Sequence, residues 1–509
     1  MYFIQRKYHS LRQTSSIIVQ FIVKFWKSIK LLSSSFIYLN TSTDQIMKKI
    51  FCFLFLPILL SAQQDNAARL KQFFDGQHDY YHFNGNVLIA KEGKPIYKQS
   101  LGYADFNTKR ALNENSVFEL ASVSKQFTAM GIMICKERGR LKYEDDIKKF
   151  FPKLPYSGIT VRHLLTHTSG IPSYEDQFEK YWDHKNIAHN KDVVDMLIQQ
   201  KDTLLFKTGS KWMYSNTGFA LLASIIEKVS GEKYNDFMAK NIFKPLSMTH
   251  TFIYNSRRTT HKIPENYALG YVYSDSLKRH ILPDSLASHD IVYYLDGIVG
   301  DGCVNSTTGD LLIWDRALYS NKIVSKKSLD EMRSPLVLIN PQDSTYYYGF
   351  GVRVQPKSSI GKVISHTGGW PGYATLLEAR VDKNETIIVL SNNETSNGNI
   401  RAGIESILNG EDLVMPYLHK EIKLDPKMID QYVGKYFAFL TMEFINKNGK
   451  LYRTRKGTKD IELIPESTTK FFYADGTDRQ IEFGVDESGK VNKAWFINTG
   501  QKGELKKVD

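Results

Sequence analysis

The sequence predicts an α+β protein with a separate all-β part at its C-terminal end, and three observations lead to this prediction. Segments that alternate like β-strands stand at both ends of the region from 85 to 391. Apolar segments with helical spacing lie between them. From residue 432 onward, short strand-like segments alternate with turns, which is typical of a small barrel or sandwich. A chain of 509 residues is long enough for this organisation.

Four segments carry the strand pattern of the larger part. Residues 85–91 and 95–101 flank the turn sequence Glu92-Gly93-Lys94, and this arrangement predicts a β-hairpin. Residues 374–381 and 385–391 read as two further strands. The strands therefore come first and last in this part, with the predicted helices between them.

The central helical segment runs from Gln126 to Arg138 and is preceded by a serine and a lysine. Residues 129–135 are apolar without a break, which indicates a helix buried inside a domain. Ser122 and Lys125 are three positions apart and would share one helix face. The free N–H groups and positive dipole end of a helix favour negative charge there. A lysine beside the serine oxygen is the arrangement of an activated nucleophile.

The Ser-x-x-Lys spacing is weak on its own. An isolated match is more often an N-cap serine with a solvated lysine. The burial of the following helix and two further motifs distinguish Ser122. The same spacing recurs at Ser230/Lys233, Ser359/Lys362 and Ser467/Lys470.

The second motif is Tyr214-x-Asn216, which precedes a helical segment at 219–229. A loop just before a helix is well suited to pointing side chains into a cleft. The alternative is a loop tyrosine packed by its ring. The same spacing at Tyr38-x-Asn40 lies in the N-terminal leader and carries no such context.

The third motif, His366-Thr367-Gly368-Gly369-Trp370, follows a strand-like segment at 361–365. Two glycines after a strand allow a backbone to approach a substrate closely. His167 lies in the small polar loop 166–172. It is either a general base or, as we favour, part of a loop whose side chains bond its own backbone. Residues 251–294, rich in tyrosine and histidine, can be interpreted only as a cleft-covering insertion.

The charge distribution gives no indication of nucleic-acid binding. The net charge is +13, but residues 1–62 hold eight Lys and Arg against one acidic residue. The rest of the chain has 59 basic and 53 acidic residues. Cys52, Cys135 and Cys303 form neither a metal-ligand spacing nor a disulfide framework.

The leader predicts export. Residues 47–62 combine Lys48 and Lys49, an apolar run from 50 to 60, and small residues at the end, which is the pattern of a secretory signal peptide. The apolar run is too short to span a bilayer comfortably. Residues 1–46 are interpreted as a non-native upstream extension. The alternative, a transmembrane helix, is disfavoured by three lysines within their apolar stretch.

The three motifs, together with Leu165-Thr166-His167-Thr168-Ser169-Gly170, resemble those of the serine β-lactamase and penicillin-binding-protein-like family. The resemblance is greatest to class C β-lactamases and their esterase and D-peptidase relatives, and it covers roughly residues 70–410. It implies an antiparallel sheet flanked by helices, with a mostly helical subdomain. The expected domains are a hydrolase at 63–410, a linker at 411–426, and a small lipocalin-like β-barrel at 427–509.

The resemblance also implies the chemical roles. Ser122 would attack a carbonyl and become acylated, while Lys125 and Tyr214 would share the work of the base. The backbone N–H groups of Ser122 and Gly369 would form the oxyanion hole. Water would then hydrolyse the acyl-enzyme, without a metal or another cofactor.

Substrate binding is expected from Asn216, which would bond the substrate amide, and from His366, Thr367 and Gly368. The family's third motif usually begins with lysine, whereas His366 stands here. Because histidine is mostly neutral near pH 7, a permanent charge for a substrate carboxylate is missing. This difference favours an esterase or D-peptidase over a β-lactamase. A penicillin-binding or sensor protein that acylates without turnover, and a binding scaffold, remain the alternatives.

Overall fold

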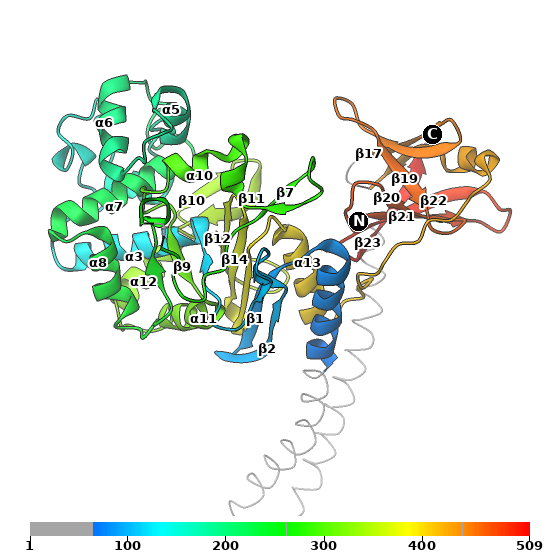
Figure 1. Cartoon of the computed structure of the whole chain (residues 1–509), viewed down its shortest axis with the longest axis horizontal. Coiled ribbons are helices and arrows are strands. Elements are labelled where there is room, and N and C mark those ends of the chain that lie inside the picture. Colours follow the sequence, from blue (N-terminus) through cyan, green and yellow to red (C-terminus); the bar gives the residue numbers. More distant parts are fainter. Residues whose placement is uncertain (1–64, 261, 396, 439–440, 509) are drawn as a thin grey trace, which may run out of the picture. The chain divides into compact units, whose positions relative to one another are not determined.

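An eight-stranded antiparallel sheet organises the larger part of the molecule (Figure 1). The computed structural model describes residues 65–508, except 261, 396, 439 and 440. The predicted upstream extension and signal peptide lie outside these residues. In order across the sheet, the strands are β10 (Val337–Asn340), β11 (Asp343–Tyr348), β12 (Arg353–Gln355), β13 (Val363–Trp370), β14 (Tyr373–Arg380), β15 (Glu385–Ser391), β1 (Gly85–Lys91) and β2 (Lys94–Leu101).

The first strand of the chain pairs with the last strand of this sheet. Strand β1 lies between β2 and β15. Val87 therefore pairs with Val389, a residue from the other end of the domain sequence. Val87 and Ile89 point into one core, and Leu88 and Ala90 point into the other. Both faces of β1 are therefore buried, which explains why its sequence is apolar at successive positions rather than only at alternate ones.

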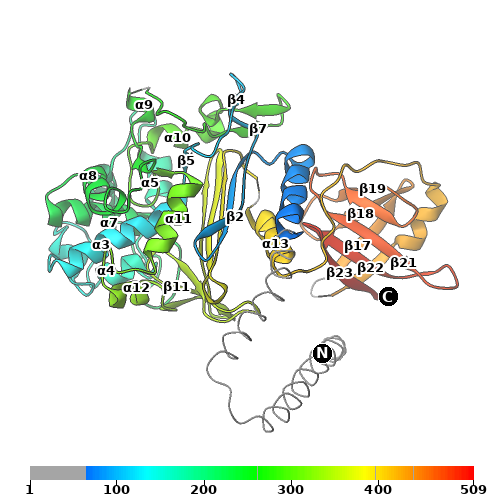
Figure 2. The ribbon, with the colours of Figure 1, turned by 90° about the horizontal axis from the view of Figure 1, so that it is seen from below.

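Helices cover both faces of the sheet (Figure 2). One face is covered by the helix at residues 65–81 and by α13 (Asn397–Leu408). The other face carries the larger core and the helical subdomain. The helices of that side are α3 (Lys125–Glu137), α4 (Val161–Leu165), α5 (Tyr174–Tyr181), α6 (Asn190–Gln200), α7 (Asn216–Ser230), α8 (Tyr234–Met238), α9 (Arg257–Thr260), α10 (Ile291–Tyr294), α11 (Thr308–Ala317) and α12 (Lys326–Met332).

Small elements connect the sheet to the helical subdomain. A three-stranded sheet places β9 (Val304–Ser306) between β5 (Phe118–Glu119) and β6 (Phe252–Ile253). The 3-10 turn η1 (Ala121–Ser124) leads from β5 directly into α3. Two further hairpins pair β3 (Tyr103–Asp105) with β4 (Arg110–Ala111) and β7 (Val272–Ser274) with β8 (Arg279–Ile281).

The C-terminal part is a closed antiparallel barrel in which each strand pairs with the next and the last pairs with the first. Side chains fill its interior, as expected for a barrel of this strand number. A 3-10 segment, η7 (Pro426–Tyr432), precedes it. The strands are β16 (Gly434–Phe437), β17 (Thr441–Lys447), β18 (Lys450–Thr454), β19 (Ile461–Pro465), β20 (Lys470–Tyr473), β21 (Gln480–Val485), β22 (Val491–Asn498) and β23 (Gln501–Val508).

The predicted fold class is confirmed: an antiparallel sheet flanked by helices is followed by a small all-β barrel. Two local expectations need correction. Asn216 is the first residue of α7 rather than a loop residue, because Ser215 is the N-cap. The third motif lies within β13 rather than after a strand. The boundaries at residues 63, 410 and 426 remain predictions. Among the described residues, no helix is both long and apolar enough to cross a membrane.

Candidate active site

Ser122 lies in the short 3-10 turn that joins β5 to the buried helix α3. The residue before it, Ala121, has a φ of 46°, a left-handed conformation that is uncommon for a residue with a Cβ. The turn is held from β14, because Thr375 Oγ1 donates a hydrogen bond of 2.8 Å to the Leu120 carbonyl. It is also held from β9, because the Leu120 N–H donates to the Val304 carbonyl at 2.8 Å. Two strands thus fix the backbone that presents Ser122.

Gly368 allows the turn to approach the sheet so closely. A Cβ at this position would lie 2.1 Å from the Leu120 carbonyl oxygen and 2.2 Å from Thr375 Oγ1. Any other residue would therefore push β13 away from the turn. A Cβ at the neighbouring Gly369 would meet open space, because Gly369 lines the pocket. Of the two glycines, the first is needed for packing and the second leaves room in the cleft.

Lys125 is completely buried and connects three parts of the site. Its Nζ donates hydrogen bonds to Ser122 Oγ at 3.2 Å, to Asn216 Oδ1 at 2.8 Å and to the Asp301 carbonyl at 2.8 Å. A lysine ammonium has three N–H donors, and these three acceptors use all of them. The buried charge is therefore stabilised by polar partners in place of water.

Asn216 is held in one orientation from both ends of its amide group. Its Oδ1 accepts from Lys125, while its Nδ2 donates to Glu175 Oε1 at 2.8 Å. Glu175 is the second residue of α5, which begins after the N-cap Ser173. Burial raises the pKa of the Glu175 carboxyl, while the hydrogen bond from Asn216 opposes this shift. Glu175 thus positions the amide of the second motif.

Tyr174 and Asp301 form a second supporting pair behind Lys125. The Tyr174 hydroxyl donates to Asp301 Oδ2 at 2.8 Å, and the Asp301 carbonyl accepts from Lys125. Burial, with the nearby Asp301 carboxylate, raises the pKa of Tyr174 well above its ordinary value. Tyr174 therefore remains a neutral hydrogen-bond donor.

The second-motif tyrosine, Tyr214, lies beside the lysine but within an aromatic cluster. Lys125 Nζ is 4.9 Å from the centre of the Tyr214 ring, and the His167 ring centre is 4.5 Å away. The Tyr214 hydroxyl is buried and has no hydrogen-bond partner among the described residues. Tyr214 is not among the residues that line the pocket at Ser122, so its expected role as a base stays a prediction.

His167 supports the structure of the site. Its Nδ1 accepts a hydrogen bond of 3.1 Å from the Ser215 N–H, and burial lowers its pKa well below the ordinary value. The surrounding loop bonds its own backbone, for example from the Ile171 N–H to Ser169 Oγ at 3.3 Å. These contacts agree with the structural interpretation of the loop.

His366 is placed differently from the expectation. Its side chain is 1% exposed and is absent from the residues that line the pocket, as are those of Thr367 and Gly368. His366 Nδ1 lies 2.7 Å from the Thr367 carbonyl, and Nε2 lies 3.0 Å from the Tyr348 hydroxyl. Since a carbonyl can only accept, the proton is on Nδ1, and Tyr348 donates to Nε2.

The expected role of His366 in substrate binding therefore stays a prediction, because its ring is buried and does not line this pocket. Burial, with Lys125 nearby, lowers the pKa of His366 to about 3. The ring is neutral at pH 7 and packs behind the cleft, where it connects β13 to β11. Its sequence position after a strand could not reveal this, because neighbouring residues of a strand point to opposite faces.

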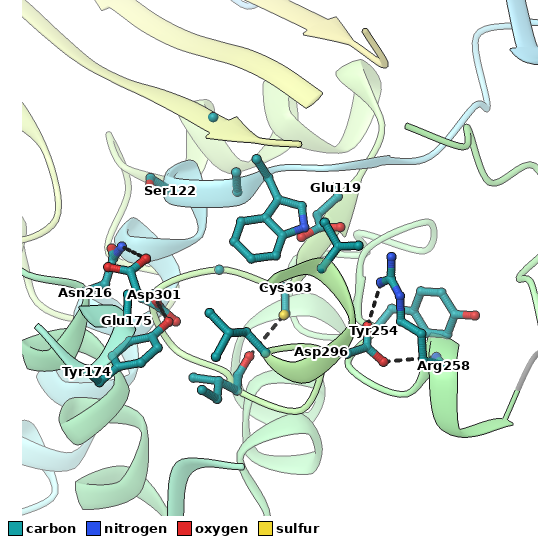
Figure 3. A pocket seen from close by; sticks show the side chains of 17 residues that line it. Glu119, Ser122, Tyr174, Glu175, Asn216, Tyr254, Arg258, Asp296, Asp301 and Cys303 are labelled. Atoms are coloured by element: carbon teal, nitrogen blue, oxygen red, sulfur yellow. Dashed lines mark hydrogen bonds and ion pairs between the residues drawn. The ribbon is translucent and has the colours of Figure 1, made fainter. Parts of the chain in front are cut away.

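A pocket opens at Ser122 and extends away from it (Figure 3). Ser122, Glu175, Asn216 and Asp301 lie at one end of it in this view. Glu119, Tyr254, Asp296 and Arg258 lie at the other end, with Cys303 between the two groups. The pocket combines residues of all three predicted motifs with acidic and aromatic lining residues that the sequence did not predict. The other lining residues are Ala121, Tyr174, Val292, Leu295, Ile298, Gly302, Gly369 and Trp370.

Comparison with known proteins agrees with this geometry. The family model described as Beta-lactamase matches residues 70–410, which is more than half of the chain. The chain belongs to the β-lactamase family. It is 41% identical over 433 residues to "Penicillin-binding protein 4*" of Bacillus subtilis (strain 168), covering 84% of this chain and 95% of that protein.

Two solved structures of similar fold extend the comparison. A penicillin-binding protein homologue from Pyrococcus abyssi, described as octameric, has a TM-score of 0.62 and 23% identity, covering 86% of this chain and 99% of that one. D-amino acid amidase from Ochrobactrum anthropi SV3, in complex with L-phenylalanine, has a TM-score of 0.54 and 24% identity, covering 64% and 92%. At these identities the likeness concerns the fold.

Within this β-lactamase-family cleft, the sequence motifs did not predict the acidic and aromatic lining residues Glu119, Tyr174, Glu175, Tyr254, Asp296 and Asp301. Tyr174 and Glu175 follow the N-cap serine of α5, so a helix start just after the loop 166–172 was the available signal. The segment 251–294, interpreted as a cleft-covering insertion, contributes Tyr254, Arg258 and Val292 to the lining. It has no clear sequence period, so no local pattern pointed to these three residues.

Proposed function

We propose that this protein is an exported serine hydrolase that forms an acyl-enzyme on Ser122 and cleaves ester or amide bonds. The observation that carries the proposal is the contact of the buried Lys125 ammonium with Ser122 Oγ and Asn216 Oδ1. Export rests on the signal-peptide pattern at 47–62. Among substrates, we favour esters and amides or peptides of D-amino acids over β-lactams.

The proposed reaction begins at the Ser122 hydroxyl. Its oxygen attacks the substrate carbonyl as its proton passes to a base, formed by Lys125 after proton loss or by Tyr214. The N–H groups of Ser122 and Gly369 stabilise the resulting oxyanion. The bond to the leaving alcohol or amine then breaks, and the leaving group takes up the proton. Water attacks the ester on Ser122, which releases the acid and restores the hydroxyl.

The charge of the cleft supports the preference for substrates without a carboxylate next to the scissile bond. The lining carries Glu119, Glu175, Asp296 and Asp301, and Arg258 is its only basic residue among the described residues. The Arg258 guanidinium is already paired with Asp296 at 2.9 Å. The Lys125 ammonium at Ser122 also has all three donors in use. A substrate carboxylate would therefore meet several carboxyl groups and no unpaired cation among the described lining residues, which disfavours its binding. The D-amino acid amidase of similar fold adds support for amide substrates.

A penicillin-binding or sensor protein that becomes acylated on Ser122 without turnover is the second candidate. The 41% identity to a protein named "Penicillin-binding protein 4*" favours it. This candidate uses the same nucleophile, so the two differ in the rate at which water removes the acyl group.

A substrate screen with a covalent probe tests the proposal. Wild type and Ser122→Ala are compared on p-nitrophenyl esters, D- and L-amino acid amides, D-alanyl peptides and nitrocefin, with fluorophosphonate and fluorescent penicillin as labels. We expect turnover of esters or D-configured amides and labelling that is lost in Ser122→Ala. Labelling that persists in the variant would overturn the nucleophile assignment. Stable labelling without turnover of any substrate would favour the second candidate.

A further inference from the structure

The end of the cleft farther from Ser122 in Figure 3 carries the carboxyl group of Glu119, which is hydrogen-bonded to none of the residues that the structure describes. Glu119 lines the pocket and is partly buried. Its carboxylate makes no hydrogen bond and no ion pair with any of the described residues. Glu119 is fixed in place by its backbone, because β5 pairs with β9 and places Glu119 opposite Asn305. The side chain is therefore presented to the cleft by a paired strand.

The arginine nearest to this end does not neutralise Glu119. Arg258 Nη1 lies 2.9 Å from Asp296 Oδ1, and its Nη2 lies 2.9 Å from Asp284 Oδ1. The neighbouring Arg257 also pairs with Asp284, at 3.1 Å. These two arginines and two aspartates pair with one another. Arg257 and Arg258 act on Glu119 electrostatically without forming an ion pair with it, so Glu119 adds a carboxyl group to the pocket wall that has no paired cation among the described residues.

From this arrangement we infer that Glu119 forms a subsite for a primary ammonium group of the substrate. An ammonium is compact and donates three hydrogen bonds, so it suits a single unpaired carboxylate beside an arginine that already pairs with two aspartates. The pocket lining also includes Tyr254, Val292 and Leu295, which can pack against an aliphatic chain that carries the ammonium. The favoured substrate is a peptide, amide or ester with a lysine-like side chain or a free amino group some distance from the scissile carbonyl.

The inference has a pH signature. Burial raises the pKa of the Glu119 carboxyl to about 7, opposed by Arg258. Glu119 therefore loses its proton as the pH rises from 6 to 8, so an ammonium should bind more tightly at pH 8 than at pH 6. The groups that face Glu119 are Arg257, Arg258, Tyr267, Asp296, Asp301, Cys303 and Tyr373. Burial raises the pKa values of Tyr267, Cys303 and Tyr373, so these three stay neutral over this range.

The test compares matched D-alanyl peptides in which lysine replaces norleucine, either on the acyl side or on the leaving-group side of the scissile bond. Binding of each peptide is measured by calorimetry to two proteins, the Ser122→Ala variant and the Ser122→Ala/Glu119→Gln double variant. We expect the lysine peptide of one placement to bind about tenfold tighter than its norleucine partner. Glu119→Gln should abolish this preference and change norleucine binding less than twofold. Glu114→Gln, which removes an exposed carboxylate five residues earlier, is the matched control and should change nothing.

Three results would overturn the inference: no lysine preference in either placement, a preference that survives Glu119→Gln, or a preference that does not weaken at pH 6. A second test keeps Glu119 and varies the salt concentration, because the preference for the lysine peptide should decrease as ionic strength rises. The subsite rests on the proposed function only in using the same cleft. Because Ser122→Ala cannot turn over, failure of hydrolysis counts against the proposed function and failure of the binding preference counts against the subsite.

Discussion

The hydrolase domain and the barrel bury different kinds of side chain. The hydrolase interior contains Lys125, His366, Glu378 and Arg380, each at most 1% exposed. The barrel interior is mainly apolar and aromatic, and its buried polar side chains are Asp478, Gln480 and Thr499. Burying a charge is unfavourable unless it is paired, and each such group in the hydrolase needs its own acceptors or donors. The hydrolase therefore adds buried basic side chains and their hydrogen bonds to an apolar core, whereas the barrel interior depends mainly on packing.

Two of the buried groups of the hydrolase lie at or next to the candidate active site. Lys125 contacts Ser122 directly, and His366 holds the strand that carries Gly369. In the barrel, Phe483 packs edge to face against both Phe444 and Phe471, and these contacts stabilise the fold. The comparison predicts that substitutions in the first region alter activity most, and that substitutions in the second alter stability alone.

The largest effect is expected for Lys125→Ala. Removing the ammonium takes away the partner of Ser122 Oγ and of Asn216, and general acid–base groups contribute roughly 10²–10⁴-fold to rate. We expect kcat/KM for a p-nitrophenyl ester to fall within that range. Lys136→Ala on the same helix is the control and should stay within twofold of wild type. Near-normal turnover by Lys125→Ala would show that Lys125 only supports the fold.

Phe483→Ala should destabilise the barrel by about 3–5 kcal/mol, because it leaves a cavity in a packed aromatic core. Urea unfolding followed by tryptophan fluorescence gives the stability, and Trp495 lies on β22 of the barrel. The rate of Ser122 labelling should not change. Phe437→Ala, at an exposed barrel position, is the control. A matching loss of labelling would contradict the division between the two regions.

His366 should make stability, rather than substrate binding, depend on pH. Its folded pKa of about 3 lies below the ordinary 6.5, so the unfolded chain binds more protons between these values. Its contribution is complete above pH 6.5 and falls by about 2 kcal/mol by pH 5. His366→Gln keeps an acceptor for Tyr348 and should remove that part of the slope. Equal slopes in wild type and variant would mean that His366 titrates normally.

A lysine at position 366, the residue with which the family's third motif usually begins, would be buried in this structure. His366→Lys would bury an unpaired charge, so we expect it to reduce stability rather than to improve hydrolysis of carboxylate-bearing substrates. Measuring unfolding free energy and nitrocefin hydrolysis for this variant separates the two outcomes.

The smallest effect is expected for Tyr174→Phe, which removes one hydrogen bond to Asp301 behind Lys125. A loss of about 1 kcal/mol, or about fivefold in kcat/KM, is typical of such a bond. Tyr293→Phe, at an exposed position, is the control. A decrease as large as that of Lys125→Ala would show that Asp301 sets the position of the lysine more strongly than this contact indicates.

The sequence by itself determined the features that depend on local spacing. Burial on both faces makes the central residues 87–90 of β1 and 387–390 of β15 apolar at successive positions. The turn Asp475-Gly476 lies between β20 and β21 as its residues predict. The first two motifs predicted residues of the candidate site, and Lys125 Nζ is hydrogen-bonded to both Ser122 and Asn216.

Only the tertiary structure decided which side chains face the cleft. The pairing of β1 with β15 joins residues about 300 positions apart, and no local pattern encodes such a contact. His366 turned inward because the motif lies within a strand, and Glu119, Glu175 and Arg258 reached one pocket from three separate segments. A side chain's charge state depends on what surrounds it in space, so burial and partners could be assigned only after the chain was folded.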